Sequence, residues 1–509
     1  MISEPKVTIQ IIPAAQFATV SAQKVLVIGQ MISGTATATV LEQGIGNSSN
    51  ENALFGRKSH IAGMIRRFKK VNKQSQLDAL PLADVPTTAV KGTSIIEFAG
   101  TATEDGTYYV SVCSKKDHKY KVDVTSGDTA EEIATTLLAL SNADADAPFT
   151  GGSATAVITY TAANGGTLCN NWGIESEGQV AGITVTVTGW TGGANDPTLT
   201  SILDVIANIR YQTIIIPSAY VLDVFGTELA ARWNTANAIL DGVGVQILDD
   251  TLANLKTATS SLNNQVLVVF GEKAISRTLK KGATILEMQD HLAAEFAAIE
   301  SLRFIPGASV SDYITTTSPT DQFGGMHMGS LPYFNTKMPY SSVSPQIDEF
   351  SEEDLNELTD NAVAVLGANR ARNATIMGTV VTTYLTDGAG NPDTSYKYLN
   401  TVRTASLIRE YFFENIKSKF SQYRLTSGDL ISGASIANLS SIRAYFKQLY
   451  INLSEELLVV AGNVAIKDFD DNLVITADYS SGTITYSIAP LLVSQIRVFL
   501  GTQQVKFAN

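Results

Sequence analysis

The feature that most constrains the fold of this chain is a series of continuous apolar runs separated by helical stretches. The runs lie at residues 24–30, 213–218, 245–250 and 265–271. Runs that are apolar throughout are typical of strands buried on both faces. Amphipathic helices are indicated at residues 60–72, 228–240, 251–262 and 286–303. This alternation of strand and helix predicts an α/β domain with a parallel sheet and right-handed crossovers.

Between residues 92 and 193 the sequence changes to short alternating runs rich in threonine, glycine and alanine. The runs predict strands at residues 94–100, 107–112, 119–125, 155–162 and 183–190. One helix is predicted over residues 129–144, with Asp128 or Thr129 as its N-cap and acidic residues in its first turn. Because the surrounding sequence is α/β, we interpret this segment as a β-rich domain inserted into another domain.

The last third of the sequence has an α+β pattern. Ser351 and Asp354 form a capping box for a helix over residues 352–367, which Gly367 is expected to end. Residues 374–400 predict two strands around a Gly/Asn/Pro turn. Further helices are predicted at residues 402–420 and 435–450, and further strands at residues 472–479, 482–490 and 495–507.

The composition argues against several classes of function. The formal net charge is −13, whereas nucleic-acid binding needs basic surface, so no nucleic-acid partner is expected. Charged residues make up 17% of the chain, below the roughly 25% that is usual, so other subunits are expected to cover part of its surface. No apolar run approaches the roughly 20 residues of a membrane span, so no membrane insertion is expected. Two cysteines and an opening without a signal peptide indicate production in a cytoplasm.

No catalytic, metal or cofactor site is predicted, so the chain is not expected to be an enzyme. Gly29 and Gly34 have the spacing of a phosphate-binding loop, but Thr35 stands where its lysine would be. The acidic residues 349–354 fit the first turn of a helix, and residues 386–393 fit a hairpin turn better than a calcium loop. The histidines lack the local pairing of a zinc site: His60, His118, His291 and His327.

Both ends of the chain alternate polar and apolar residues, which predicts terminal strands. Their apolar positions are Val7, Ile9, Ile11, Ile496, Val498, Val505 and Phe507. A free terminal strand exposes unpaired backbone and an apolar row, and pairing with another copy of the chain would satisfy both. The alternative is that both ends fold back on their own domain.

Several segments, taken in order, resemble Mu-like phage tail sheath proteins. In the carboxy-terminal part these are residues 381–404 (VTTYLTDGAGNPDTSYKYLNTVRT), 406–425 and 489–507. Upstream, the similar segments are residues 53–72, 77–84, 100–112, 125–144 and 161–174. The similarity covers nearly the whole chain except its opening residues. The sheath of a tailocin or another contractile injection system shares this fold and is the alternative.

The resemblance implies a structural role in a virion tail. Such sheaths are stacks of hexameric rings around a tail tube, and their contraction drives the tube through the host envelope for genome ejection. The implied partners are further copies of the chain, the tail tube protein, and the baseplate and tail terminator proteins. Assembly in the host bacterial cytoplasm, without a cofactor, is implied as well. A rival interpretation is a surface-binding protein or enzyme, in which Tyr108, Tyr109 and Trp190 make the insertion a carbohydrate-binding module and do not simply pack.

The resemblance also implies an α/β plus α+β multidomain fold with strand-exchanging arms. Its parts are an N-terminal arm (1–22), a subtilisin-like but non-catalytic α/β domain (23–91 and 197–335), an inserted β-rich peripheral domain (92–196), a tube-proximal α+β domain (336–495) and a C-terminal arm (496–509). The implied recipient of the arms is the hairpin around residues 374–398, and the alternative is the hairpin around residues 472–489. The candidate recipient residues are Ile376, Val380, Thr382, Tyr384, Tyr396 and Tyr398.

Overall fold

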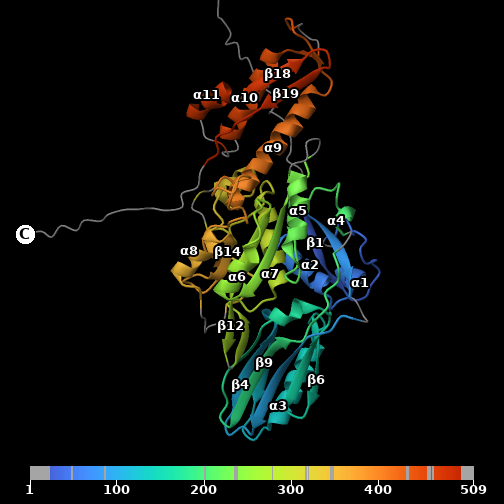
Figure 1. Ribbon diagram of the computed structural model, residues 1–509. Helices are drawn as coiled ribbons and strands as arrows, with labels where there is room; N and C mark the ends of the chain where they lie inside the picture. The colour runs from blue at the N-terminus through green and yellow to red at the C-terminus, as the bar shows by residue number, and fades with distance from the viewer. Residues whose placement is uncertain are drawn as a thin grey trace, which may run out of the picture. The chain divides into compact units, whose positions relative to one another are not determined.

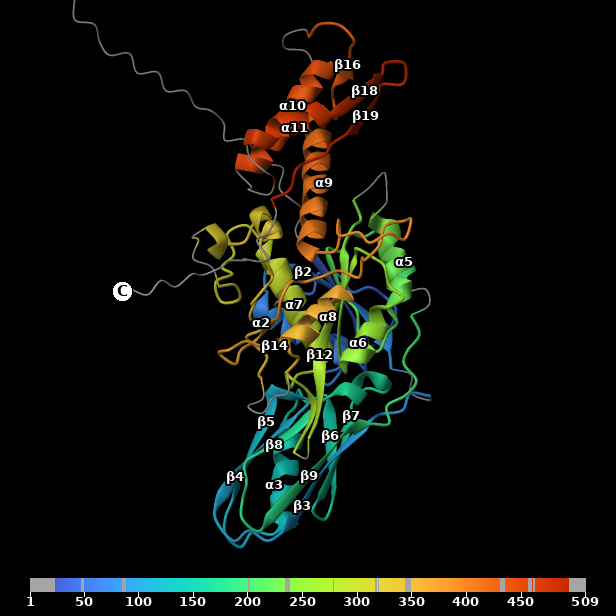
Figure 2. The ribbon, with the colours of Figure 1, turned by 60° about the vertical axis from the view of Figure 1, so that its left-hand side comes forward.

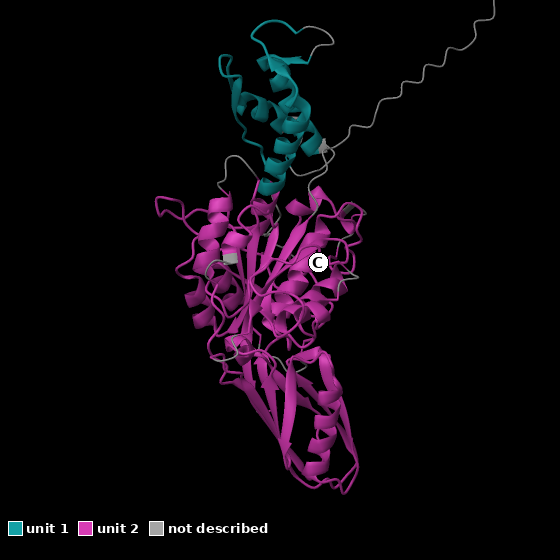
Figure 3. Ribbon diagram, turned by 90° about the vertical axis from the view of Figure 1, so that its right-hand side faces the viewer, with its two compact units in different colours: residues 1–21, 405–493 teal, residues 22–404, 494–509 magenta. Residues whose placement is uncertain are grey.

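The parallel sheet that the apolar runs predict is present in the structure, a computed structural model (Figures 1 and 2). The structure describes residues 23–46, 50–84, 88–199, 202–233, 239–277, 279–315, 318, 320–343, 349–430, 435–455, 460 and 463–493. These residues form two compact units (Figure 3): residues 23–404, magenta and keyed there as unit 2, are called the first unit here, and residues 405–493, teal and keyed there as unit 1, are called the second unit.

The α/β sheet of the first unit has the strand order β2-β1-β10-β11-β12-β14-β15. These strands span Gln76–Ala83, Lys24–Met31, Thr213–Ile215, Val243–Asp250, Leu267–Arg277, Val363–Ala368 and Ala374–Ile376. The pairings from β2 through β14 are parallel, and β15 pairs antiparallel with β14. β1 is buried along almost its whole length, as a strand covered on both faces must be.

Helices cover both faces of this sheet. One face carries α1, α2 and α7, which span Glu51–Phe55, His60–Val71 and Gln289–Arg303. The other face carries α4, α5, α6 and α8, which span Ile202–Val205, Leu222–Trp233, Leu252–Thr259 and Glu352–Asp360. Every residue of α7 is buried. The predicted α/β alternation is therefore confirmed.

One predicted helix is shorter than its sequence suggested. The capping box of Ser351 and Asp354 is present, but α8 ends at Asp360. Ala362 follows with φ of +64°, a left-handed conformation that breaks the helix. The apolar run that begins at Val363 then becomes β14, which pairs in parallel with β12. The prediction that this run is helical was wrong. Its pairing with β12 in the buried sheet determines its structure, and the local sequence pattern does not.

The inserted segment forms two sheets and one helix. One sheet has the order β6-β7-β3-β9, whose strands span Phe149–Ala154, Val157–Ala162, Thr93–Gly100 and Ile183–Thr191. The other contains β8, β4 and β5, which span Ile174–Glu177, Gly106–Val112 and Ser114–Val124. Helix α3 (Ala130–Ala143) begins at the predicted cap Thr129, which forms a capping box with Glu132. Strands β6 and β8 were not predicted.

The insertion is joined to the α/β sheet by backbone hydrogen bonds as well as by the chain. β12 pairs with β11 as far as Lys273, and its last residues pair with β13 (Lys280–Ala283). β13 in turn pairs with β8 of the insertion. The result is one continuous 11-stranded sheet that runs from the α/β core into the insertion.

The second unit is helical with a β-hairpin. α9 (Leu399–Phe420) starts in the first unit and enters the second at Ala405. The other elements are α10, α11, β16, β17, β18 and β19, which span Leu439–Glu455, Asn463–Asn472, Arg424–Leu425, Ile436–Ala437, Val474–Asp478 and Thr483–Ser487. Short 3-10 helices in the first unit span Thr167–Asn171, Thr320–Gln322 and Met326–Ser330. Across the described ranges, no helix is long and apolar enough to cross a membrane.

The start of the second unit differs from the domain boundary that we placed at residue 336. β14 and β15 lie between these two positions, and they complete the α/β sheet through the pairing of β14 with β12. Residues up to Thr404 therefore pack with the first unit.

The buried acid Glu272 on β12 gives the first unit a testable pH dependence. It lies beside Asp249 of β11 in the parallel register, and each has one buried oxygen without a hydrogen-bond partner among the described residues. Burial raises the pKa of both side chains well above the ordinary value, and Asp249 further raises the pKa of Glu272. In the folded state Glu272 therefore keeps a proton. In the unfolded chain the same side chain loses this proton near the ordinary glutamate pKa of about 4.3.

Stability is expected to fall as the pH rises from about 5 toward the raised pKa, by about 1.4 kcal/mol for each unit of difference in pKa. Glu272→Gln keeps the acceptor for the Ile285 amide and removes the titration. We expect this variant to gain stability over the parent protein between pH 5 and pH 8 in denaturant titrations. Glu353→Gln, at an exposed position, is the control. Its free energy of unfolding should differ from that of the parent protein by the same amount at pH 5 and at pH 8. A pH-independent difference for Glu272→Gln would contradict the assignment.

Candidate assembly surface

The sequence-predicted arm strands lie outside the described residues. This applies to Val7, Ile9, Ile11, Ile496, Val498, Val505 and Phe507. Their pairing with other copies stays a prediction. The surfaces that could receive them can be compared directly, because both predicted recipient segments are described.

The segment around residues 374–398 is not a hairpin of two strands. Beyond β15, its pairing is limited to isolated bridges between Val381 and Tyr398 and between Thr386 and Pro392. β15 is covered on its outer side as well, since Asn335 donates its amide to Ile376 at 3.0 Å and Met338 donates to Ala374 at 2.8 Å. The prediction of two regular strands here was wrong, because the chain uses its backbone for contacts within the first unit.

The six candidate recipient residues divide into a buried and a half-buried group. Ile376, Val380 and Thr382 are buried, while the half-buried ones are Tyr384, Tyr396 and Tyr398. Thr382 donates its amide to the Lys397 carbonyl at 2.8 Å, and the next amide, of Thr383, reaches Leu267 of β12 at 2.9 Å. Little backbone is left in this segment for a strand from another molecule.

Unlike residues 374–398, β18–β19 in the second unit is a regular two-stranded hairpin. Its strands pair antiparallel over five residue pairs, from Val474–Ser487 to Asp478–Thr483. Within the described residues it is a two-stranded sheet, with no further strand on either edge. A two-stranded hairpin needs either further strands or a helix packed against it to be stable in water, and this one packs on α10. Its outer edges carry no strand among the described residues, so they could accept one by β-augmentation.

The turn of this hairpin is fixed by Asp478. Its carboxylate accepts hydrogen bonds from the amide and hydroxyl of Ser480 and from the hydroxyl of Ser481, at 2.9, 2.6 and 2.7 Å. These bonds lower the pKa of Asp478 to about 2. Gly482 follows with φ of +68°, a conformation that glycine adopts without strain. The turn therefore helps to hold the two strands in register.

One face of the hairpin packs on the helices and the other is exposed. Tyr486 meets Phe446 of α10 with ring centroids 4.9 Å apart, and Tyr450 stacks on Phe469 of α11 at 4.3 Å. Val474 at the start of β18 is 57% exposed, and Tyr479, which follows the end of the same strand, is also exposed. An open edge next to exposed apolar side chains is an aggregation hazard in a lone chain, so a protein partner is expected to cover it.

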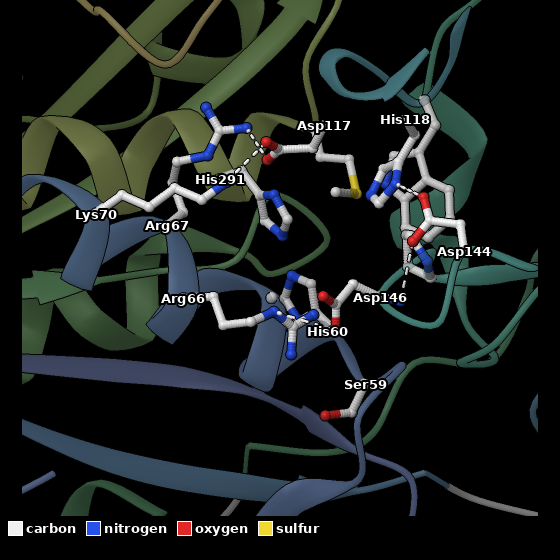
Figure 4. A pocket seen from close by; sticks show the side chains of 14 residues that line it. Ser59, His60, Arg66, Arg67, Lys70, Asp117, His118, Asp144, Asp146 and His291 are labelled. Atoms are coloured by element: carbon white, nitrogen blue, oxygen red, sulfur yellow. Dashed lines mark hydrogen bonds and ion pairs between the residues drawn. The ribbon is translucent and has the colours of Figure 1, made fainter. Parts of the chain in front are cut away.

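A cavity lies elsewhere, between α2 and the insertion (Figure 4). It has a volume of about 170 Å³ and brings together His60, His118 and His291, which are far apart in the sequence. His60 Nε2 lies 2.8 Å from Asp290 Oδ2, and His118 Nδ1 lies 2.8 Å from Asp144 Oδ2. Burial, reinforced by Arg67, lowers the pKa of His291 well below its ordinary value.

These pairs do not form a catalytic or metal-binding arrangement in the part of the chain that is described. A hydrolytic triad needs a hydroxyl on the second nitrogen of the histidine. The second nitrogen of His60, Nδ1, has no hydrogen-bond partner among the described residues, and a Cβ added at Gly29 would lie 3.0 Å from it. No group of three or more potential metal ligands is found among the described residues. The cavity is a polar junction between the insertion and the core.

Arg67 of α2 holds this junction together. Its guanidinium is 1% exposed and donates to Glu287 at 2.7 Å, to Asp117 of the insertion at 2.9 Å and to Glu295 of α7 at 3.0 Å. Burial by itself lowers the pKa of Arg67, but the three carboxylates raise it above its ordinary value. Burial raises the pKa of Glu287, and Arg67 opposes that shift. The sequence predicted α2 as a basic helix but gave no sign of this network.

The aromatic residues of the insertion do not form a binding platform. Tyr108 and Trp190 are each 2% exposed and belong to the insertion core. Tyr109 is exposed, but the ammonium group of Lys119 lies 4.8 Å from its ring centroid. Tyr108 and Trp190 therefore pack in the core, and Tyr109 contacts a lysine. The three aromatic residues proposed for carbohydrate binding do not form a shared exposed surface.

No protein-family model matches the chain. A curated relative, the Mu-like prophage FluMu tail sheath protein of Haemophilus influenzae, is 27% identical over 412 residues, which are 79% of this chain and 77% of that protein. A solved sheath tail protein of Desulfitobacterium hafniense aligns with a TM-score of 0.46 and 10% identity, over 96% of this chain and 100% of that chain. The contracted helical sheath of the anti-feeding prophage aligns with a TM-score of 0.45 and 10% identity, over 99% of each chain. The curated relative confirms the resemblance to Mu-like tail sheath proteins.

Proposed function

We propose that this chain, a relative of Mu-like tail sheath proteins, is the sheath subunit of a contractile phage tail. The observation that carries the proposal is an open hairpin, β18–β19, in a chain whose curated relative is named a tail sheath protein. A subunit of this kind acts by packing against its own copies, without catalysis and without a cofactor. Its place is the virion tail, and its assembly takes place in the host cytoplasm.

The subunits form stacked hexameric rings around the tail tube, between the baseplate and the tail terminator. Each copy donates its terminal arms, residues 1–22 and 496–509, to neighbouring copies. The receiving edge is β18–β19, which lies in the hairpin around residues 472–489 that was predicted as the alternative recipient. Its free edges support this choice over residues 374–398, whose backbone is already engaged. Donated strands would keep neighbours connected while their rigid parts rotate.

Contraction is driven by a change of packing. The extended sheath is a kinetically trapped arrangement, and contraction releases it to a better-buried one. The continuous sheet through β12, β13 and β8 supports the idea that the insertion and the α/β core move together as one rigid part. The tube is driven through the host envelope by this movement, which leads to genome ejection.

Microscopy of the purified full-length protein tests the proposal. Negative-stain images are expected to show hollow cylinders of uniform diameter at micromolar concentrations, without any other protein. Analytical ultracentrifugation of the same sample should show large assemblies that disappear on dilution or in mild denaturant. A folded protein that stays monomeric at all concentrations and salt conditions would contradict the proposed function.

A further inference from the structure

One end of the insertion carries a dense group of carboxylates. They come from the β3–β4 turn, the end of β5 and the start of α3, and we call this end the acidic tip: Glu104, Asp105, Asp123, Asp128, Glu131 and Glu132. Backbone contacts hold these turns together, since Gly127 donates its amide to the Ala102 carbonyl at 2.8 Å. The amide of Ser126 also donates to Asp105, at 2.7 Å. Lys121 is the neighbouring cation, and it pairs with Asp123 at 2.8 Å.

The other end of the insertion borders a groove with the opposite charge. The groove has a volume of about 570 Å³ and lies between the start of β5, residues 337–343 and the turn before β15. We call it the basic groove, after its cations Lys115, Lys116, Lys119, Lys337 and Arg372. Lys115 and Lys119 share Glu177, and Arg372 pairs with Glu349. Lys116 and Lys337 have no ion-pair partner among the described residues.

The tip and the groove of one copy cannot meet. β5 starts in the groove at Lys115 and reaches the tip at Asp123, eight residues later. A strand rises about 3.3 Å per residue, so roughly 25 Å of rigid sheet separates the two patches. A partner for either patch must therefore come from another molecule.

Rings and helical stacks are built from heterologous contacts, in which one patch of a subunit meets a different patch of its neighbour. Such contacts need two complementary surfaces on the same chain, and the tip and the groove are such a pair. Charge matters here because each copy carries a net charge of −13, so most other approaches of two copies are repulsive.

We propose that the acidic tip of one copy docks into the basic groove of a neighbouring copy. This inference rests on the proposed function and deepens it, because it assigns the insertion a contact between sheath subunits. The excess cations Lys116 and Lys337 are the groups that receive the carboxylates of the tip.

Charge reversal in the full-length protein tests this contact. Lys116→Glu with Lys337→Glu is expected to raise the concentration for half-maximal assembly about tenfold, because attraction at each contact becomes repulsion. Glu104→Lys with Glu131→Lys at the tip should have a similar effect. Combining the two pairs should restore assembly to within about threefold of the parent protein. Lys91→Glu with Lys281→Glu, outside the groove, makes the same change in charge and is the control.

A second readout is carbodiimide cross-linking of mixed light and heavy isotope-labelled protein. It should join Lys116 or Lys337 of one copy to Glu104 or Glu131 of another. Groove variants that assemble like the control would overturn the inference alone, and so would groove defects that tip reversal does not rescue. A parent protein that never assembles and never cross-links between copies would overturn both this inference and the proposed function.

Discussion

Replacing Arg67 by methionine is expected to lower the free energy of unfolding of the first unit by about 3–5 kcal/mol. The reason is that Glu287 and Glu295 are fully buried and lose the cation that both of them bind. Methionine fills a similar space, so the decrease in the free energy of unfolding would come from the lost positive charge and not from a cavity. Without Arg67 the pKa of Glu287 rises further, so the defect should grow as the pH increases from 5 to 8.

Arg57→Ala is the matched control for this prediction. Arg57 pairs with Asp146 across the same junction at 2.8 Å, but both side chains are well exposed. Exposed pairs contribute little, so the denaturation midpoint of this variant should stay close to that of the parent protein. Combining Arg67→Met with Glu287→Gln and Glu295→Gln should recover a large part of the loss, because no buried charge is then left unpaired. Equal midpoints for Arg67→Met and Arg57→Ala would show that the network contributes little.

Removing residues 1–12 and 497–509 together is expected to abolish cylinder formation. If each arm pairs over about five residues, and each hydrogen bond adds about 0.5–1.5 kcal/mol, the two arms contribute several kcal/mol per subunit. A loss of that size moves the assembly concentration by several orders of magnitude. Sedimentation and negative-stain microscopy measure the effect directly.

The truncated protein should keep its fold, since neither deletion touches the described residues of the two units. Its far-ultraviolet circular dichroism and unfolding midpoint are therefore expected to match those of the full-length chain. Deleting only one arm should weaken assembly less than deleting both. Cylinders of normal diameter from the doubly truncated chain would contradict the account.

Most strands and helices of the core could be predicted from the local sequence pattern. The apolar run of β1 and the amphipathic pattern of α2 sufficed, because burial on both faces of a sheet leaves a signature within a few residues. Thr129 and Ser351 were identified as caps because a capping box depends only on neighbours three residues apart. β14 was misassigned because its strand state depends on β12, which lies far away in the sequence.

The functional surfaces were less predictable, since they depend on contacts between distant segments. Arg67 lies 220 residues from Glu287 and 228 residues from Glu295, so no local motif connects them. The gathering of His60, His118 and His291 around one cavity has the same cause. The two hairpins predicted near the carboxy terminus looked alike in sequence. Only the structure distinguishes them, because Thr383 donates its amide to β12 while no further strand pairs with β18–β19 among the described residues.

A cryo-electron microscopy map of the self-assembled cylinder, with the chain traced from residue 1 to residue 509, tests the central claim most directly. The account predicts that residues near Val7–Ile11 and Ile496–Phe507 of adjacent copies form strands along the outer edges of β18–β19. The hairpin of each subunit would then be the centre of a sheet built from more than one chain. Arms that fold back on their own subunit, with the edges of β18–β19 left bare, would contradict it.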